Sequence, residues 1–268
     1  MAGIGLNLRL SYLDQVCDTP PGEVDYWEVI AENLIGNPQA LEQVKTIRAH
    51  TPIALHCVGM NLGGVDPIST TYLDEIAELE RVLDPWLISD HFCWQRFGGV
   101  SHHDLLPLPL SPSTCAHVAA RINFVQQRLG RSIALENLSQ YVVYRQSSMT
   151  EAESLQQIAE STGCRLLLDL NNIEINAHNL GVPVHRYMTA EFLEHVVALH
   201  VAGPEVVDDF WLDTHGSAPS NWQQHWVNHL SHLPACYERD NAIPPLIESL
   251  AVVRVLKRGR KEARCSKM

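Results

Sequence analysis

Three polar residues near one apolar run carry side chains of the kind that bind metals in proteins. His200 ends the apolar run VVALH, and Asp213 and His215 follow it after a short loop. Imidazole nitrogens and carboxylate oxygens are common ligands of iron, manganese and zinc. A single histidine of this kind is more often a hydrogen-bonded structural residue, and an aspartate after a strand often caps a helix. The three residues indicate a metal site only if other donors reach the same place.

Other apolar runs of the chain end in the same kinds of residue. The further candidate donors are His56, His91, Glu136, Asp169 and Glu238. If the runs are neighbouring strands, buried carboxylates at their ends would repel one another unless cations neutralised them. The donors also outnumber the roughly four to six ligands that one ion takes. The pattern therefore favours about two or three ions bridged by Glu136, and it fits iron, manganese or zinc equally.

The elements that would position these donors follow a βα pattern along the chain. Apolar runs typical of strands alternate with longer stretches whose apolar residues recur every three or four positions. The predicted strands are residues 4–8, 26–31, 52–58, 86–92, 132–138, 165–171, 196–202 and 235–240. Helices are predicted at residues 38–50, 70–83, 114–130, 150–161, 221–233 and 244–257. This alternation over roughly 250 residues predicts an α/β fold, a (β/α)8 TIM barrel whose active-site loops converge on one mouth.

Composition and motifs argue against several other classes of protein. No GxGxxG motif follows the first predicted strand, as a dinucleotide-binding open sheet would require. The formal net charge of −12 opposes binding to nucleic acid. Seven scattered cysteines without a CxxC pair argue against a disulfide framework and a cysteine zinc site. The chain shows no signal-peptide pattern and no apolar run of the roughly 18 residues that span a membrane, so we expect a cytoplasmic protein.

No linker divides the chain, so we assign residues 1–256 to one TIM-barrel catalytic domain. The motif KRGRK at 257–261 opens a basic C-terminal stretch, residues 257–268. Such a terminal run is usually a solvated, frayed tail, although its charge would also suit a contact with RNA or a membrane.

Residues beside the candidate donors have less specific roles. Glu28, in the second predicted strand, would either orient a metal-binding histidine or cap a helix. Arg239 and Asp240 would form an ion pair beside Glu238. These residues are expected to support the site without binding the metal.

Several motifs along the chain resemble those of a known metalloenzyme family. They are GVDP (64–67), ISDHFCW (88–94), HHDLLPLPLS (102–111), QRLGRSIALENLSQY (127–141), GCRLLLDLNNIEINAHNLG (163–181), LHVAG (199–203), DTHG (213–216) and YERDNAIPPL (237–246). In this order they resemble the multinuclear non-haem iron-dependent oxidative enzymes, TIM-barrel proteins that include the methanobactin biosynthesis oxidase. The barrel is also similar to the wider superfamily of xylose isomerase and endonuclease IV.

The resemblance implies a set of metal ligands at the strand ends. Carried over position by position, these are His56, His91, Glu136, Asp169, Asn172, His200, Asp213, His215 and Glu238. Asn172 stands where endonuclease IV has a histidine, which departs from the zinc site of that enzyme and agrees with the oxidative family.

The resemblance also implies a reaction and its participants. Enzymes of this family use about two or three iron ions, in the Fe(II) and Fe(III) states, and O2 to oxidise cysteine residues of ribosomally made precursor peptides. The expected partners are the precursor peptide and a small protein that binds its leader segment. Zinc or manganese is the alternative metal.

Two other kinds of function stay open from the sequence. The first is a zinc-dependent endonuclease IV-like enzyme or a sugar isomerase-like metalloenzyme on the same barrel. The acidic charge and Asn172 oppose the endonuclease. The second is a metal-binding protein without catalytic activity, which would hold its ions and leave every candidate peptide unchanged.

Overall fold

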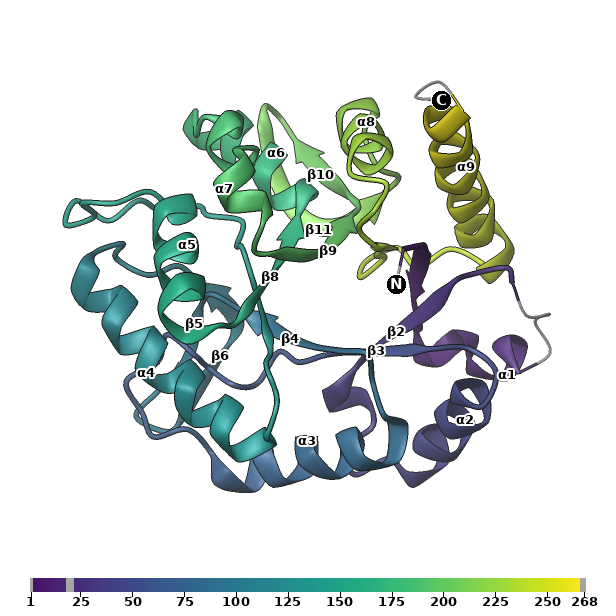
Figure 1. Cartoon of the computed structure of the whole chain (residues 1–268), viewed down its shortest axis with the longest axis horizontal. Helices are drawn as coiled ribbons and strands as arrows, with labels where there is room; N and C mark the ends of the chain where they lie inside the picture. The colour runs from purple at the N-terminus through teal and green to yellow at the C-terminus, as the bar shows by residue number, and fades with distance from the viewer. Residues whose placement is uncertain (1, 18–21, 266–268) are drawn as a thin grey trace.

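The strands of the computed structural model, which describes residues 2–17 and 22–265, close into a parallel barrel (Figure 1). The barrel strands are β1 (Ile4–Asn7), β2 (Tyr26–Ile30), β3 (Ile53–His56), β4 (Leu87–His91), β7 (Ala134–Glu136), β8 (Arg165–Asp169), β9 (Val196–Val201) and β12 (Ala235–Tyr237). They pair in chain order, and β12 closes the ring against β1. The predicted TIM barrel is confirmed, and each strand ends earlier than the sequence suggested.

Helices surround the barrel on its outside (Figure 1). They are α1 (Leu13–Val16), α2 (Pro38–Arg48), α3 (Thr70–Leu83), α4 (Pro112–Leu129), α5 (Glu151–Thr162), α6 (Leu170–Leu180), α7 (Ala190–Leu193), α8 (Asn221–His229) and α9 (Leu246–Cys265), with 3-10 turns η1 (Leu10–Tyr12), η2 (Ala31–Asn33) and η3 (Val184–Tyr187). All six predicted helices are present. Their ends carry the expected signals: Thr150 and Glu153 form a capping box on α5, and Gly130 and Gly163 end α4 and α5 at positive φ.

Helix α6 begins where the sequence suggested that a strand continued. The Asp169 side chain accepts a 2.6 Å hydrogen bond from the Asn172 backbone N–H, so it caps the helix and ends β8. Residues 170 and 171, predicted as strand, are therefore helical. The cap leaves the second carboxylate oxygen of Asp169 free to face the barrel interior.

Two antiparallel hairpins extend from the mouth of the barrel. The first joins β5 (Trp94–Phe97) to β6 (Val100–Leu106), and the second joins β10 (Gly203–Val207) to β11 (Phe210–Ser217). Gly98 and Gly99 adopt positive φ at the first turn, and Asp208 does so at the second. The sequence placed Asp213 and His215 in a loop, whereas both lie on strand β11.

The basic C-terminal stretch is helical as far as the structure describes it. Helix α9 continues through residue 257 to Cys265, and residues 266–268 lie outside the described residues. Val253 and Leu256 are buried, and Arg260 donates hydrogen bonds to the backbone carbonyls of Gly3 and Val227. These contacts hold the basic residues on the barrel. Among the described residues, no helix is long and apolar enough to cross a membrane.

One buried apolar residue from each of seven barrel strands forms a cluster separate from the main core. Its members are Tyr26, Ala54, Leu87, Ala134, Leu167, Ala198 and Cys236. Side chains two positions apart on a strand point to the same face, so the next inward layer consists of the residues two positions further on. That layer is polar, and it lies nearer the mouth.

Candidate metal centre

The polar layer contains most of the predicted metal donors. Two positions beyond the apolar cluster stand Glu28, His56, Ser89, Glu136, Asp169, His200 and Glu238. All of these residues are buried, although every one except Ser89 ordinarily ionises near or below neutral pH. A strand periodicity of two residues thus places an apolar floor beneath a ring of imidazole and carboxylate groups.

His56, His91 and Glu136 form the first group that could hold a metal ion. One ligand atom from each lies within 4.8 Å of the others. The Nε2 atoms of His56 and His91 lie 3.6 Å and 3.5 Å from Glu136 Oε2. Ser89 Oγ lies 2.8 Å from His56 Nδ1, which turns Nε2 of that ring toward the glutamate.

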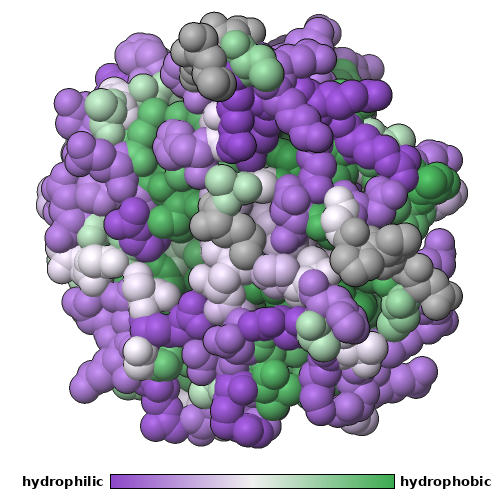
Figure 2. All heavy atoms as spheres, turned by 45° about the vertical axis from the view of Figure 1, so that its right-hand side comes forward, coloured by the Kyte–Doolittle hydropathy of each residue, from purple (hydrophilic) through white to green (hydrophobic). Residues whose placement is uncertain are grey.

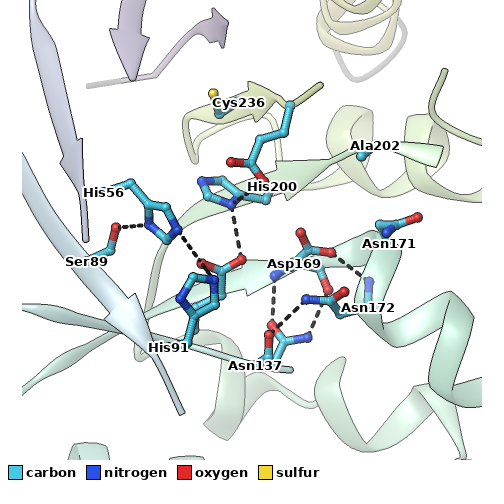
Figure 3. Close-up of polar contacts among 12 residues, drawn as sticks. His56, Ser89, His91, Asn137, Asp169, Asn171, Asn172, His200, Ala202 and Cys236 are labelled. Carbon is cyan, nitrogen blue, oxygen red and sulfur yellow. Dashed lines mark hydrogen bonds and ion pairs between the residues drawn. The ribbon is translucent and has the colours of Figure 1, made fainter. Parts of the chain in front are cut away.

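Glu136 also belongs to a second group, with Asp169, His200 and Glu238. Their ligand atoms again lie within 4.8 Å of one another. His200 Nδ1 is 3.1 Å from Glu136 Oε1 and 2.9 Å from Glu238 Oε2. Figure 3 shows the rings of His56, His91 and His200 directed into one space between the strands. The two oxygens of Glu136 therefore face two different groups of donors.

Asp213, His215 and Asn172 complete the ring on the side of hairpin β10–β11. His215 Nδ1 lies 2.8 Å from Asp240 Oδ2, and its Nε2 lies 3.0 Å from Asp213 Oδ1. Asp240 thus orients the ring so that Nε2 faces the interior. The Asn172 amide donates to the Asn137 carbonyl at 3.1 Å (Figure 3). This hydrogen bond leaves its side-chain oxygen directed elsewhere.

Several buried polar atoms of the ring lack a hydrogen-bond partner. Among the described residues they include His91 Nδ1, Glu136 Oε2, Asp169 Oδ2 and Asn172 Oδ1. An unsatisfied buried polar atom costs about 1–3 kcal/mol. Such atoms from one ring of nitrogen and oxygen donors fit one or more cations. The adjoining cavity of about 210 Å³ gives access from the mouth.

The electrostatics of the acids favour the same interpretation. Burial raises the pKa of Glu136 to about 8 and that of Asp169 to about 6. At neutral pH Glu136 therefore keeps its proton in most molecules, while Asp169 is mainly ionised although burial opposes its charge. A bound cation would supply the positive charge that favours the ionised form of both.

The histidines divide into two kinds. Burial lowers the pKa of His56 well below its ordinary value and that of His91 to about 4, so both rings are neutral, the form that binds metal. Burial also opposes charge on His200 and His215, yet the surrounding carboxylates raise the pKa of both. A metal ion would take the place of those protons.

All nine predicted site residues meet in this part of the barrel. The cavity is lined by His56, His91, Glu136, Asn172, Asp213, His215 and Glu238, and Asp169 and His200 adjoin them through the contacts above. Glu28 lies 3.0 Å from His200 Nε2, so of its two predicted roles it orients a histidine. Asp240 pairs with Arg9 at 2.8 Å, while Arg239 donates to the Ala242 carbonyl, so the predicted Arg239–Asp240 pair is wrong.

The sequence interpretation missed the supporting contacts of Ser89 and Ser139. Ser139 Oγ donates to Asp213 Oδ2 at 2.7 Å, and it stands three residues after Glu136 in an irregular loop. Ser89 could have been found, because it lies two positions before His91 on one strand. Ser139 follows no such periodicity.

Comparison with known families identifies the kind of protein to which this barrel belongs. The model of the family described as RiPP precursor modification enzyme MbnB/TglH/ChrH matches residues 3–259. The chain belongs to this family. The predicted family membership is therefore confirmed, and the match spans nearly the whole barrel.

Other proteins with similar sequences match this chain over almost its full length. A UPF0276 protein of Caulobacter vibrioides is 36% identical over 258 residues, which are 94% of this chain and 92% of the relative. A UPF0276 protein of Vibrio parahaemolyticus is 34% identical over 251 residues, covering 90% and 86% of the two chains. These names state no activity.

Solved structures similar to this family member share its fold. A D-tagatose 3-epimerase-like protein superimposes with a TM-score of 0.66 at 13% identity, covering 100% of both chains. Endonuclease IV from Thermus thermophilus gives a TM-score of 0.64 at 14% identity, covering 97% of this chain and 99% of its own. At these identities the comparison shows the TIM-barrel fold alone.

Proposed function

We propose that the chain is an iron-dependent, O2-using oxidase that modifies cysteine residues of a ribosomally made precursor peptide. Its family of RiPP precursor modification enzymes supports the peptide substrate. The observation that carries the metal-dependent chemistry is the position of Glu136 between two groups of donors. Bound iron would supply the activation of O2 and the binding of a substrate thiolate.

The proposed ligands divide around Glu136. His56 and His91 would hold one ion, while Asp169, His200 and Glu238 would hold another. Asn172, Asp213 and His215 would complete the set, either around these ions or around a third. We propose about two or three irons, with Fe(II) and Fe(III) together, because a donor set of this size exceeds what one ion takes. Zinc or manganese is the alternative for the same donors.

The chain's own residues would orient the substrate and exclude water. The cavity beside the donors is also lined by Leu105, Leu138 and Tyr141, which contribute apolar surface near the mouth. A cysteine side chain entering this cavity would leave bulk water before it reached the ring. Ser139 and Asn171 hold the Asp213 carboxylate through hydrogen bonds of 2.7 Å and 3.0 Å, so this donor is fixed before substrate arrives.

Exposed apolar side chains at the mouth suit a peptide. We call this surface the apolar rim, and it consists of Tyr141, Val142, Val143, Val206, Val207 and Phe210. Tyr141 and Phe210 join its two segments through a ring contact with centroids 5.7 Å apart. Exposed apolar clusters often mark interaction sites. We propose that the rim receives the precursor peptide, and that a small leader-binding protein works with the enzyme in the cytoplasm.

The family match favours this function over the alternatives. Epimerases and endonuclease IV resemble the chain in fold alone, whereas the family model covers residues 3–259. A sugar isomerase-like enzyme would need no oxygen, and an endonuclease would act on nucleic acid despite the net charge of −12. A non-catalytic metal-binding protein would leave every peptide unaltered.

The test is a reconstitution with a co-expressed cysteine-containing peptide encoded beside this gene. Protein purified without oxygen should contain about two or three irons per chain and should consume O2 only when the peptide is present. Mass spectrometry should then show a change at a cysteine residue. Iron-loaded protein that consumed no O2 with its peptide would contradict the oxidase. Activity with zinc alone, under anaerobic conditions, would support the alternative enzymes.

A further inference from the structure

A second polar cavity lies at the end of the barrel opposite to the candidate metal centre. It has a volume of about 350 Å³, and its lining includes Gly3, Ile4 and Asp25. Ile4 is the first residue of β1, and Asp25 directly precedes β2. The cavity therefore faces the amino-terminal ends of the strands. The metal donors stand at the carboxyl ends.

Helix α9 directs a stripe of basic side chains into this cavity. Lys257, Arg260, Lys261 and Arg264 all line it. Their spacing of three, four and seven residues places them on one face of the helix. The stripe overlaps the KRGRK motif, and Arg258 of that motif is exposed outside the cavity lining. The local concentration of positive charge contrasts with the net charge of −12 of the whole chain.

Arg260 is the buried member of the stripe, with 5% of its surface exposed. Its Nε donates to the Val227 carbonyl at 3.2 Å, and its Nη1 donates to the Gly3 carbonyl at 2.9 Å. Nη2 is buried, and no described residue accepts a hydrogen bond from it. Burial lowers the pKa of Arg260 to about 10, so the guanidinium stays charged at neutral pH. A charged side chain that lines the cavity thus keeps one donor without a partner among the described residues.

Asp25 is the one acid among the described lining residues, and both of its carboxylate oxygens already accept hydrogen bonds. Asp25 Oδ1 accepts a hydrogen bond from Lys257 Nζ at 2.9 Å, and Oδ2 accepts one from the Ile4 backbone N–H at 2.7 Å. Arg264 donates to the neutral Ser231 carbonyl at 2.8 Å. After the pairing of Lys257 with Asp25, three cationic side chains of the stripe still face the cavity.

We propose that this cavity binds the phosphate group of a small molecule. Arg260 Nη2 would donate to a phosphate oxygen, while Lys261 and Arg264 would approach from the solvent side. A volume of about 350 Å³ lies within the range of small-molecule sites. A concave site with a buried donor suits a compact anion better than an extended polyanion such as RNA, which would contact exposed side chains. Figure 2, which brings the side of α9 forward, shows a largely hydrophilic surface there.

The experiment compares two charge reversals on one helix in the full, metal-loaded chain. Binding of inorganic phosphate and of a nucleoside monophosphate is measured by calorimetry and by thermal shift, with ionic strength held constant by sodium chloride. Lys261→Glu places a negative charge on an exposed lining residue, and Arg258→Glu makes the same change outside the lining. Because phosphate also binds metal ions, the result depends on the difference between these variants.

We expect saturable binding that raises Tm, an affinity at least about tenfold weaker in Lys261→Glu, and wild-type affinity in Arg258→Glu. Tighter binding of the nucleotide than of inorganic phosphate would identify a phosphorylated metabolite as the ligand, and equal binding would identify free phosphate. Three results would contradict the site. They are an equal rise in Tm with chloride, an equal loss of phosphate affinity in Lys261→Glu and Arg258→Glu, and tighter binding of an RNA oligonucleotide than of the small phosphates. The difference in phosphate affinity between the two variants does not depend on peptide turnover or on the identity of the metal. A negative result would therefore contradict the phosphate site and leave the proposed oxidase untouched.

Discussion

The Nε2 atom of His200 lies 3.0 Å from Glu28, while the other ring nitrogen faces Glu238 at 2.9 Å. The imidazole is therefore held between a supporting acid on β2 and a proposed metal ligand after β12. A carboxylate behind a metal-binding histidine fixes which nitrogen faces the metal and makes it a better donor. Glu28 is thus a positioning residue for His200.

Replacing Glu28 should weaken metal binding although Glu28 itself is not a proposed ligand. Glu28→Gln keeps the shape of the side chain but removes the charge that raises the basicity of His200. We expect a loss of about 10–100-fold in metal affinity, measured by competition with a chelator. The matched control is Glu174→Gln, a half-buried glutamate that accepts hydrogen bonds from Ser220 and Gln223 at 2.8 Å and 2.7 Å, away from the cavity lining. Equal affinities in wild type and Glu28→Gln would contradict the positioning role.

Removal of Glu136 should affect more metal than removal of a histidine. Glu136 belongs to both groups of donors, whereas His91 belongs to the first alone. Elemental analysis of anaerobically purified protein should show His91→Ala losing about one ion and Glu136→Ala losing ions from both groups. His225→Ala, an exposed histidine of α8, is the control and should keep the wild-type content. The shared position of Glu136 would be refuted if both site variants lost the same single ion.

The strand periodicity explains how much of this architecture could be predicted. Apolar runs predicted all eight barrel strands, and their terminal polar residues predicted the ring, because residues two apart share a face of a strand. The pairing of Glu28 with His200 joins residues 172 positions apart and depends on barrel closure. The position of Glu28 in a predicted strand made it a candidate for the site. That position did not show whether it orients a histidine or caps a helix.

The elements that were not predicted have weak or mixed local signals. Helix α6 contains four asparagines and begins at a cap, so its first residues continued the apolar pattern of β8. In hairpin β5–β6 and in hairpin β10–β11 the two strands pair with one another and not with the barrel, and most residues of β5, β10 and β11 are partly or fully exposed, so no buried face marks these strands in the sequence. Helix α9 extends into the basic stretch because Arg260 finds backbone carbonyls on two other segments.

Metal affinity should rise with pH between about 6 and 8. Burial raises the pKa of Asp169 to about 6 and that of Glu136 to about 8, so a metal ion must displace their protons below these values. Calorimetry in buffers of different ionisation enthalpy should detect protons released on binding at pH 7. An affinity that did not change over this range would contradict proton displacement.

The stability of the metal-free protein should fall as pH rises over the same range, whereas metal affinity rises. A carboxyl such as Glu136, whose pKa is raised by folding, adds stability below its unfolded value of 4.5, and this stability is lost as pH rises to about 8. His200 and His215, whose pKa values are also raised, act in the same direction. The increase in Tm caused by metal should therefore be larger at pH 8 than at pH 6.5. A metal-induced increase that fell over this interval would contradict the assignment.

The apolar rim should affect peptide binding without changing the metal content. Phe210 is 42% exposed and contacts Tyr141, whose hydroxyl accepts a hydrogen bond from the Asp213 backbone N–H at 2.6 Å. Phe210→Asp should raise the KM for the precursor peptide about tenfold or more, because a charge replaces apolar contact area, while iron per chain stays constant. Phe124→Asp, at a residue 43% exposed on α4, is the matched control. Equal KM values in the two variants would exclude the rim as the peptide surface, whereas a loss of iron in Phe210→Asp would mean that the hairpin supports the donors instead.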